Sequence, residues 1–173
     1  GIQQWGTYYG GSGLDYGQGC ESDNLGNIYL GGYTQSSNGI STPLSHQIAF
    51  GGGSLDAFLV QFNTSGTRQW GTYYGGTGND RGFGVATATN ANVYLSGMTT
   101  TGGGTDIATT DAHQIVYAGG ASDAYFAEFN SSGARIYGTY YGELGDDIGF
   151  GCTIDNSGKL YLSGHTTSSV NIS

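Results

Sequence analysis

The sequence predicts an all-β protein built from short antiparallel strands, and three observations predict it. Glycine makes up 35 of the 173 residues, about three times its usual share of about 7%. No segment keeps apolar residues at the three- and four-residue spacing of a helix. Short runs of aromatic and β-branched residues lie between Gly, Asn, Asp and Ser, for example at 27–31, 57–62 and 92–96. That alternation is typical of strands and turns.

The composition also excludes several classes of protein. The chain has 4 Lys and Arg against 13 Asp and Glu, so its formal net charge is -9. A nucleic-acid binder would need a basic face, and an anionic membrane surface would repel this charge. No apolar run approaches the roughly 20 residues that span a bilayer, so we expect no membrane span. An aromatic share of 13% argues against disorder.

A long internal repeat organises the chain. The motif Trp-Gly-Thr-Tyr-Tyr-Gly begins at Trp5 and Trp70, and it returns with Tyr in place of Trp at Tyr137, at spacings of 65 and 67 residues. Each copy is followed by an Asp, a Gly-x-Gly pair and a run that ends in Gly-x-Thr. Two copies continue through a loop to Asp-Ala-Phe or Asp-Ala-Tyr and an Asn-x-Ser-Gly turn. The repeated aspartates are Asp15, Asp80 and Asp147, together with Asp56 and Asp123.

Each repeat offers four strands, at about 16–22, 27–34, 56–63 and 67–75 in the first copy. Four antiparallel strands per repeat are typical of a β-propeller blade. We therefore expect two full blades, with partial blades at both ends of the chain. Residues 1–15 would be a terminal strand that completes a neighbouring blade, 16–76 blade 1, 77–142 blade 2, and 143–173 partial blade 3. The Gly-x-Gly pairs would lie on the innermost strands, where blades converge.

The motif set resembles the seven-bladed β-propeller repeat (SBBP) family. The resemblance rests on Trp5 and Trp70, the repeated aspartates, the Gly-Asn-Ile-Tyr run at 26–29 and the Asp-Ala-Phe run at 56–58. It implies a secreted or surface protein of a prokaryote and no particular catalytic reaction. Three departures are Tyr137 for Trp, the side chains Gln61 and Glu128 where the family often has Lys, and Ala88 where the other copies have Asp. Ala88 argues against a metal role for that Asp in every blade.

Both ends of the repeat array are unfinished. The segment at about 3–10 matches the fourth strand of a blade, and about 148–154 and 159–166 match only the first two. A propeller needs at least about four blades, so the chain is either a fragment of a longer propeller or is completed by copies of itself. We favour assembly by strand completion, which gives a ring if the rotation closes and a filament if it does not. The weakly charged, Gly- and Tyr-rich surface suits a close-packed fibre.

Two cysteines fall at equivalent positions of the first and third copies. Cys20 and Cys152 are expected to be small buried residues on inner strands or, alternatively, thiols that form a bridge between subunits. An intrachain bridge would have to cross a whole blade, beyond the usual Cα separation of about 4.4–6.8 Å. No Cys-x-x-Cys pair is present, so we expect no zinc site.

The remaining polar motifs favour structural roles. We expect His46, His113 and His165 to be structural or surface residues, because one mechanism seldom needs equivalent residues in separate blades. We expect no cofactor; weak Ca²⁺ binding near Asp80, or near Asp146 and Asp147, is the alternative that the acidic motifs leave open. Glycosylation triplets begin at Asn63, Asn130 and Asn171, the first two on equivalent hairpins.

Together these observations predict a non-enzymatic, extracellular or cell-surface structural protein of a prokaryote. Its partners would be copies of itself in a fibre or scaffold. The alternative is a fragment of a larger secreted β-propeller that binds glycan, through exposed tyrosines, or another protein.

Overall fold

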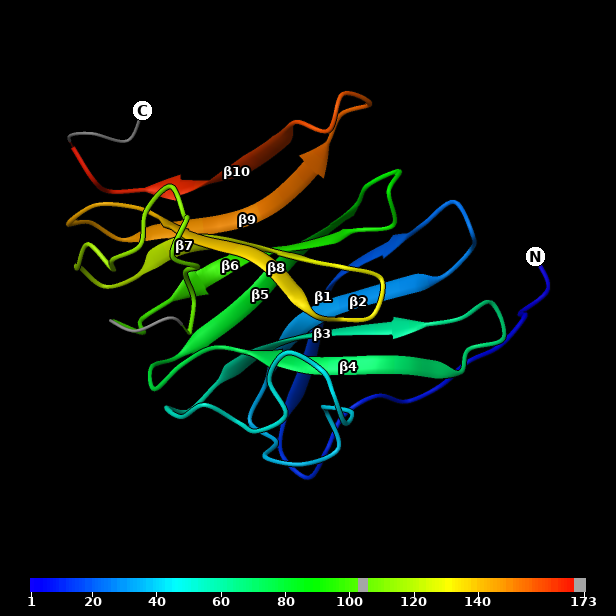
Figure 1. The fold of residues 1–173 in the computed structure, drawn as a ribbon. Coiled ribbons are helices and arrows are strands. Elements are labelled where there is room, and N and C mark those ends of the chain that lie inside the picture. The colour runs from blue at the N-terminus through cyan, green and yellow to red at the C-terminus, as the bar shows by residue number, and fades with distance from the viewer. Residues whose placement is uncertain (103–105, 170–173) are drawn as a thin grey trace.

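The computed structural model describes residues 1–102 and 106–169. Within these residues there is no helix, and ten strands form three antiparallel sheets that do not close into a ring (Figure 1). Sheet 1 contains β1 (Asp15–Ser22), β2 (Ile28–Thr34), β3 (Asp56–Phe62) and β4 (Arg68–Tyr74). Sheet 2 contains β5 (Asp80–Thr87), β6 (Val93–Thr99), β7 (Asp123–Phe129) and β8 (Arg135–Tyr141). Sheet 3 contains β9 (Asp147–Ile154) and β10 (Leu160–Thr166). The expected all-β class with blade-like sheets is confirmed.

Each sheet is a simple meander, with strands hydrogen-bonded in chain order. The first two strands of each sheet share one register: Asp15 pairs with Thr34, and Asp80 and Asp147 pair with the corresponding threonines. In sheets 1 and 2 the second and third strands also match, because Gly32 pairs with Phe58 and Gly97 with Tyr125. The observed strand ends lie within about one residue of those expected from the repeat.

The first strands of the three sheets lie side by side at the centre of the array (Figure 1). A Cβ atom on Gly19 of β1 would lie 2.5 Å from the carbonyl oxygen of Phe83 on β5. A Cβ atom on Gly84 of β5 would lie 2.7 Å from the Cα of Gly151 on β9. Neither position has room for a side chain, so the expectation that the Gly-x-Gly pairs mark innermost strands is confirmed.

The core fills the seams between successive sheets. One cluster of buried residues joins Trp70 and Tyr74 of sheet 1 to Leu95, Tyr125 and Phe129 of sheet 2. The rings of Tyr74 and Tyr125 have centroids 5.0 Å apart, and that of Phe129 is 5.7 Å from Tyr74. Aromatic pairs at such separations stabilise beyond the area they bury. Sheets 1 and 2 are thus held together by the fourth strand of the first and the third strand of the second.

The N-terminal segment differs from expectation in one respect. Residues 1–14 form no strand, although a fourth strand was expected at about 3–10. The physical reason is that a fourth strand pairs with a third strand, as β4 pairs with β3, and the described residues supply no third strand beside this segment. The segment nevertheless lies where the fourth strand of a sheet preceding sheet 1 would lie. It runs past the turn between β3 and β4, and the ring of Trp5 packs near that of Phe62 (Figure 1).

Candidate functional site

The clearest candidate site is the open side of sheet 3. Among the described residues β10 is hydrogen-bonded to a single strand, β9, whereas its counterparts β2 and β6 each lie between two strands. An unpaired strand edge exposes backbone donors and acceptors that another strand can use. The structure therefore presents an edge ready for strand addition.

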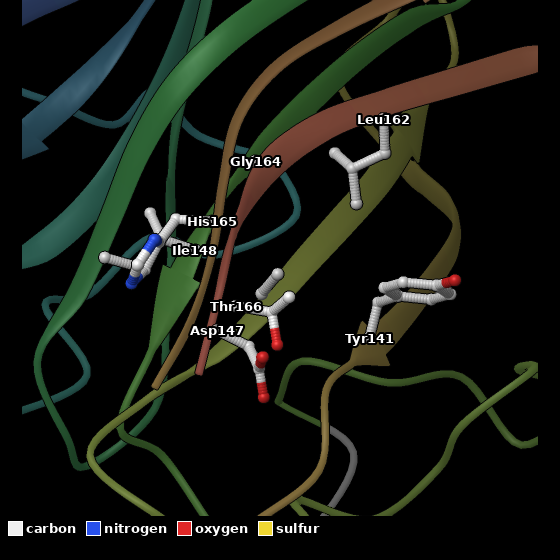
Figure 2. Close-up of a pocket in the computed structure, with 8 residues that line it drawn as sticks. Tyr141, Asp147, Ile148, Leu162, Gly164, His165 and Thr166 are labelled. Carbon is white, nitrogen blue, oxygen red and sulfur yellow. The ribbon is translucent and has the colours of Figure 1, made fainter. Parts of the chain in front are cut away.

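A cavity of about 260 Å³, open to solvent, lies beside this edge. Its walls come from four strands, namely Ala124 of β7, Tyr141 of β8, Asp147 and Ile148 of β9, and Leu162, Gly164, His165 and Thr166 of β10. Figure 2 shows the side chains of Leu162 and Tyr141 on one side of β10, with His165 and Ile148 on the other. Tyr141, Ile148 and Leu162 supply most of its apolar lining, and it lies beside the edge of β10 with which a third strand would pair.

Burial differs between equivalent residues around the cavity. Tyr74, at the end of β4, is fully buried beneath Tyr125 of the next sheet. Tyr141 holds the same place at the end of β8 and is only half-buried. Likewise Leu95 of β6 is fully buried, whereas Leu162 of β10 is half-buried. The part of sheet 3 next to sheet 2 therefore lacks the cover that sheet 2 gives to sheet 1.

The N-terminal segment carries the complementary feature. Trp5 packs against the turn after β3 as Trp70 packs against the turn after β7: a Cβ atom on Gly66 or on Gly133 would lie 2.7 Å from the respective indole. The hydroxyl of Tyr9 donates to the carbonyl of Ile40 at 2.7 Å. Tyr74 makes the equivalent bond at 2.6 Å, to Ile107. The segment is thus seated on sheet 1 as β4 is seated on sheet 2.

The first aspartate of each sheet binds the chain that precedes it. Asp15 and Asp80 accept the backbone N–H of Gly11 and Gly76, each at 2.9 Å. Asp147 accepts that of Glu143 at the same distance. Side-chain hydroxyls donate further hydrogen bonds to these carboxylates. Ser36 donates to Asp15 and Ser168 to Asp147, both at 2.9 Å. These groups tie each sheet to the preceding strand end, which is a structural role.

The aspartates of the third strands, Asp56 and Asp123, are fully buried. Asp56 accepts the N–H of Gly51, and Asp123 accepts that of Ala118 at 2.7 Å. Burial raises the pKa of Asp56 to about 7 and that of Asp123 to about 6, and the nearby carboxylates Asp80 and Asp147 add to these shifts. One oxygen of each has no hydrogen-bond partner. These shifts were not predictable from the sequence, because they come from burial in the folded chain and from a carboxylate of the next sheet.

The two cysteines are free and differ in exposure. Cys20 on β1 is exposed, so the expectation of a buried thiol is wrong for this residue; the inner face of β1 has no sheet before it. Cys152 on β9 is half-buried. Burial raises the pKa of both thiols, and the charge of Glu21 adds to the shift at Cys20. The bridge between subunits stays a prediction.

The three histidines have different surroundings. The ring of His46 lies 5.9 Å from Tyr74 and 6.0 Å from Phe129, at the seam of sheets 1 and 2. Burial, together with the charge of Arg135, lowers the pKa of His46 to about 4, so this side chain is neutral at pH 7. His113 is exposed beside Tyr141, and His165 is exposed on β10. The described residues bring no three His, Cys, Asp or Glu side chains together as a metal site, and weak Ca²⁺ binding remains a prediction.

The asparagines of two glycosylation triplets form turns. The Oδ1 atom of Asn63 accepts the N–H groups of Ser65 and Thr67, and that of Asn130 accepts the N–H of Ser132. Asp155 makes the same bonds in the turn before β10, where hydrogen bonds from Ser157 and from the N–H of Lys159 lower its pKa to about 2. The triplets at Asn63 and Asn130 therefore form the hairpin turns. Asn171 lies outside the described residues.

A scan of family models and a search of curated proteins found no match for this chain. No helix in residues 1–102 and 106–169 is long and apolar enough to cross a membrane. The candidate site therefore has to be interpreted from the residues themselves.

Proposed function

We propose that this chain is a non-enzymatic structural protein that assembles head to tail with copies of itself through blade completion. The assembly would be a fibre or scaffold at the surface of a prokaryotic cell, as the resemblance to SBBP repeats implies. In a head-to-tail contact, sheet 1 of one copy packs against sheet 3 of a second copy, as sheet 2 packs against sheet 1 within the chain. Such a contact is heterologous, so it forms a ring or a filament according to the rotation between copies.

A single observation carries this proposal: the two ends of the array bear complementary halves of one seam. The N-terminal segment is seated on sheet 1 as the fourth strand of a preceding sheet, through Trp5 and Tyr9. Sheet 3 has an uncovered flank in the place where that segment and β1 would follow. Copies joined in this way would repeat the seam that already joins sheets 1 and 2.

The inner strands support the same arrangement. Gly19 and Gly84 each touch the backbone of the next inner strand, so neither has space for a Cβ atom. Gly151 holds the equivalent place on β9, and a Cβ atom there would meet only the hydroxyl of Ser163, at 3.1 Å. Its outer side is open to a further inner strand, and β1 of another copy has the matching shape.

Gly151→Leu is the variant that tests this seam. The side chain would fit in a single copy, since little lies within reach of it, but it would collide with the next copy as a side chain on Gly84 would collide with β9. Light scattering after size exclusion should show concentration-dependent oligomers of the native chain and monomers of Gly151→Leu. Thr89→Leu, at an exposed turn residue, is the matched control and should still assemble.

Two results would contradict the proposal. The first is a native chain that stays monomeric at every concentration, with only small particles in negative-stain images. The second is assembly that Gly151→Leu leaves intact. Circular dichroism of both variants establishes that they remain folded.

A row of rings favours a second candidate function, glycan or protein binding by a larger secreted propeller. Tyr16 and Tyr33 stack with centroids 4.8 Å apart, and Phe83 and Phe150 continue the row at 6.3 and 5.7 Å. Tyr16 and Phe150 are exposed. Sugars stack on such rings. A glycan array with no ligand, or with a ligand whose binding Phe150→Ala leaves unchanged, would remove the glycan form of this candidate.

A further inference from the structure

The head-to-tail arrangement leaves one strand position empty in sheet 3. The N-terminal segment of the next copy occupies the place of a fourth strand, whereas β10 is a second strand. In sheets 1 and 2 the third strand lies between these two, as β3 lies between β2 and β4. The N-terminal segment of another copy cannot take this third-strand position, because it already occupies the position of the fourth strand.

The cavity beside β10 identifies the occupant, because sheets 1 and 2 show the same site filled. In sheet 2 the ring of Tyr125 crosses Gly97, where an added Cβ atom would lie 2.7 Å from the ring. The ring packs on Tyr74 with centroids 5.0 Å apart, and its hydroxyl donates to the carbonyl of Arg81 at 3.2 Å. In sheet 1, Phe58 crosses Gly32 in the same way, 2.8 Å from an added Cβ.

Every wall of that filled site has a counterpart around the cavity. Gly164 corresponds to Gly97, Tyr141 to Tyr74, and Ile148 to Arg81, as the shared strand register shows. A Cβ atom on Gly164 would lie 2.0 Å from the carbonyl of Ile148, just as one on Gly97 would lie 1.9 Å from that of Arg81. The glycine, the tyrosine wall and the carbonyl are all in place, and no aromatic ring from residues 1–102 and 106–169 fills the position of Tyr125.

We infer that the cavity is a slot for the aromatic side chain of an incoming β-strand that pairs with the free edge of β10. This inference rests on the proposed function and names what that assembly must also bind. The occupant is an extended polypeptide segment in which Asp, a small residue and Phe or Tyr follow one another. Its register follows from β7: the aromatic lies opposite Gly164, and the aspartate lies opposite Thr166.

A peptide with the sequence of residues 120–142, which contains β7, β8 and their turn, serves as the probe. Fluorescence anisotropy of the labelled peptide with the full chain measures binding, and hydrogen exchange locates it. We expect saturable binding and slower exchange of the amides in β10, with no change in β1. The peptide with Tyr125→Ala should bind at least about tenfold more weakly, because it loses the buried ring. The peptide with Tyr125→Phe should stay within about fivefold, because Phe58 fills the same place in sheet 1.

Protein variants test the slot from the other side. Tyr141→Ala removes the aromatic wall and should weaken binding at least about tenfold. Leu25→Ala removes an exposed side chain in the turn between β1 and β2, away from the slot, and should leave binding unchanged. The substitutions in the peptide leave the protein unchanged, so they test the slot even if Tyr141→Ala fails to fold.

The outcomes separate this inference from the proposed function. No binding of the 120–142 peptide, binding indifferent to Tyr125→Ala, or stronger protection of β10 by a peptide of residues 1–12 would each overturn the slot. Any of these could occur while the native chain still forms oligomers, and the assembly proposal would then stand alone. Specific binding to a chain that stays monomeric would support the slot and contradict head-to-tail assembly.

Discussion

Buried carboxyl groups set the chemistry of the seams at the scale of single residues. Asp56 and Asp123 are fully buried beside carboxylates of the following sheet, and burial is the main reason that their pKa values rise. The protonated form is thus favoured in the folded chain at mildly acidic pH. In the unfolded chain both groups ionise near the usual value of about 3.9.

The sign of the resulting pH dependence follows from this difference. Between about pH 4 and pH 7 the folded chain binds a proton at Asp56 that the unfolded chain has released. The stabilisation is complete below the unfolded pKa and is lost as the pH rises through about 7. The free energy of unfolding should therefore fall by up to about 1.4 kcal/mol per pH unit for this group as the pH rises through that range.

Asp56→Asn tests this at one residue. The amide stays neutral, so the variant should lose the share of the pH dependence that belongs to Asp56. Urea denaturation at pH 4.5, 6 and 8 measures the slope, and Asp111→Asn, at an exposed residue, is the matched control. A variant with the native slope would show that Asp56 does not titrate in this range.

Conformation at single residues was only partly predictable. The turns at Gly26 and Gly158 have positive φ angles, as turn glycines favour, but the equivalent turn in sheet 2 places Ala91 at a φ of 66°. Composition alone would not have placed a left-handed residue there. The repeat alignment was the signal that could have found it, since Ala91 stands where two other copies have glycine.

At the scale of elements, the repeat determined strand positions well because strand pattern and turn chemistry are local. The Asp-Ala-Phe or Asp-Ala-Tyr run marks the start of β3 and β7, and the Asn-x-Ser-Gly turn marks their end. What the sequence could not supply was pairing across sheets. The N-terminal segment has the sequence of a fourth strand, yet it forms no strand among residues 1–14, because strand structure depends on a partner.

The two tryptophans make this dependence measurable. Trp70 is buried, packs against the β7–β8 turn and donates its indole N–H to Ser131 at 3.0 Å. Trp5 is only half-buried on the equivalent turn. Trp70→Ala should lower the free energy of unfolding by about 3–5 kcal/mol, and Trp5→Ala by no more than about half of that. Chemical denaturation of dilute protein measures both, and equal losses would show that the N-terminal segment is as firmly held as β4.

For the whole molecule, the three sheets behave as successive members of one array whose flanks match. The slot beside β10 was not predictable from the sequence, because it arises from Gly164, Tyr141 and Ile148 of three different strands. The alignment of Gly164 with Gly32 and Gly97 was the available signal, but only the register shows that an aromatic ring crosses these glycines. In the proposed assembly the unfinished ends are the surfaces that meet.

A disulfide between copies tests head-to-tail assembly most directly. Cys20 lies on β1 and Cys152 on β9, both as free thiols. Cys152 hydrogen-bonds with Ser96 of sheet 2, so its thiol faces away from the next copy. Val85, the equivalent of Cys20 in sheet 2, packs against Gly31 of β2. In the proposed seam Cys20 of one copy therefore lies against β10 of another at Ser163, the counterpart of Gly31, and the variant Ser163→Cys places a second thiol there.

The measurement is mild oxidation of a mixture of isotopically light and heavy chains of Ser163→Cys, followed by mass spectrometry of the linked peptides. The account predicts a ladder of linked oligomers and peptides that join Cys20 of one isotopic form to the new thiol at position 163 of the other, abolished when Gly151→Leu is added. Linkage between Cys20 and Cys20 alone, or no mixed-isotope linkage at concentrations where the chain associates, would contradict it.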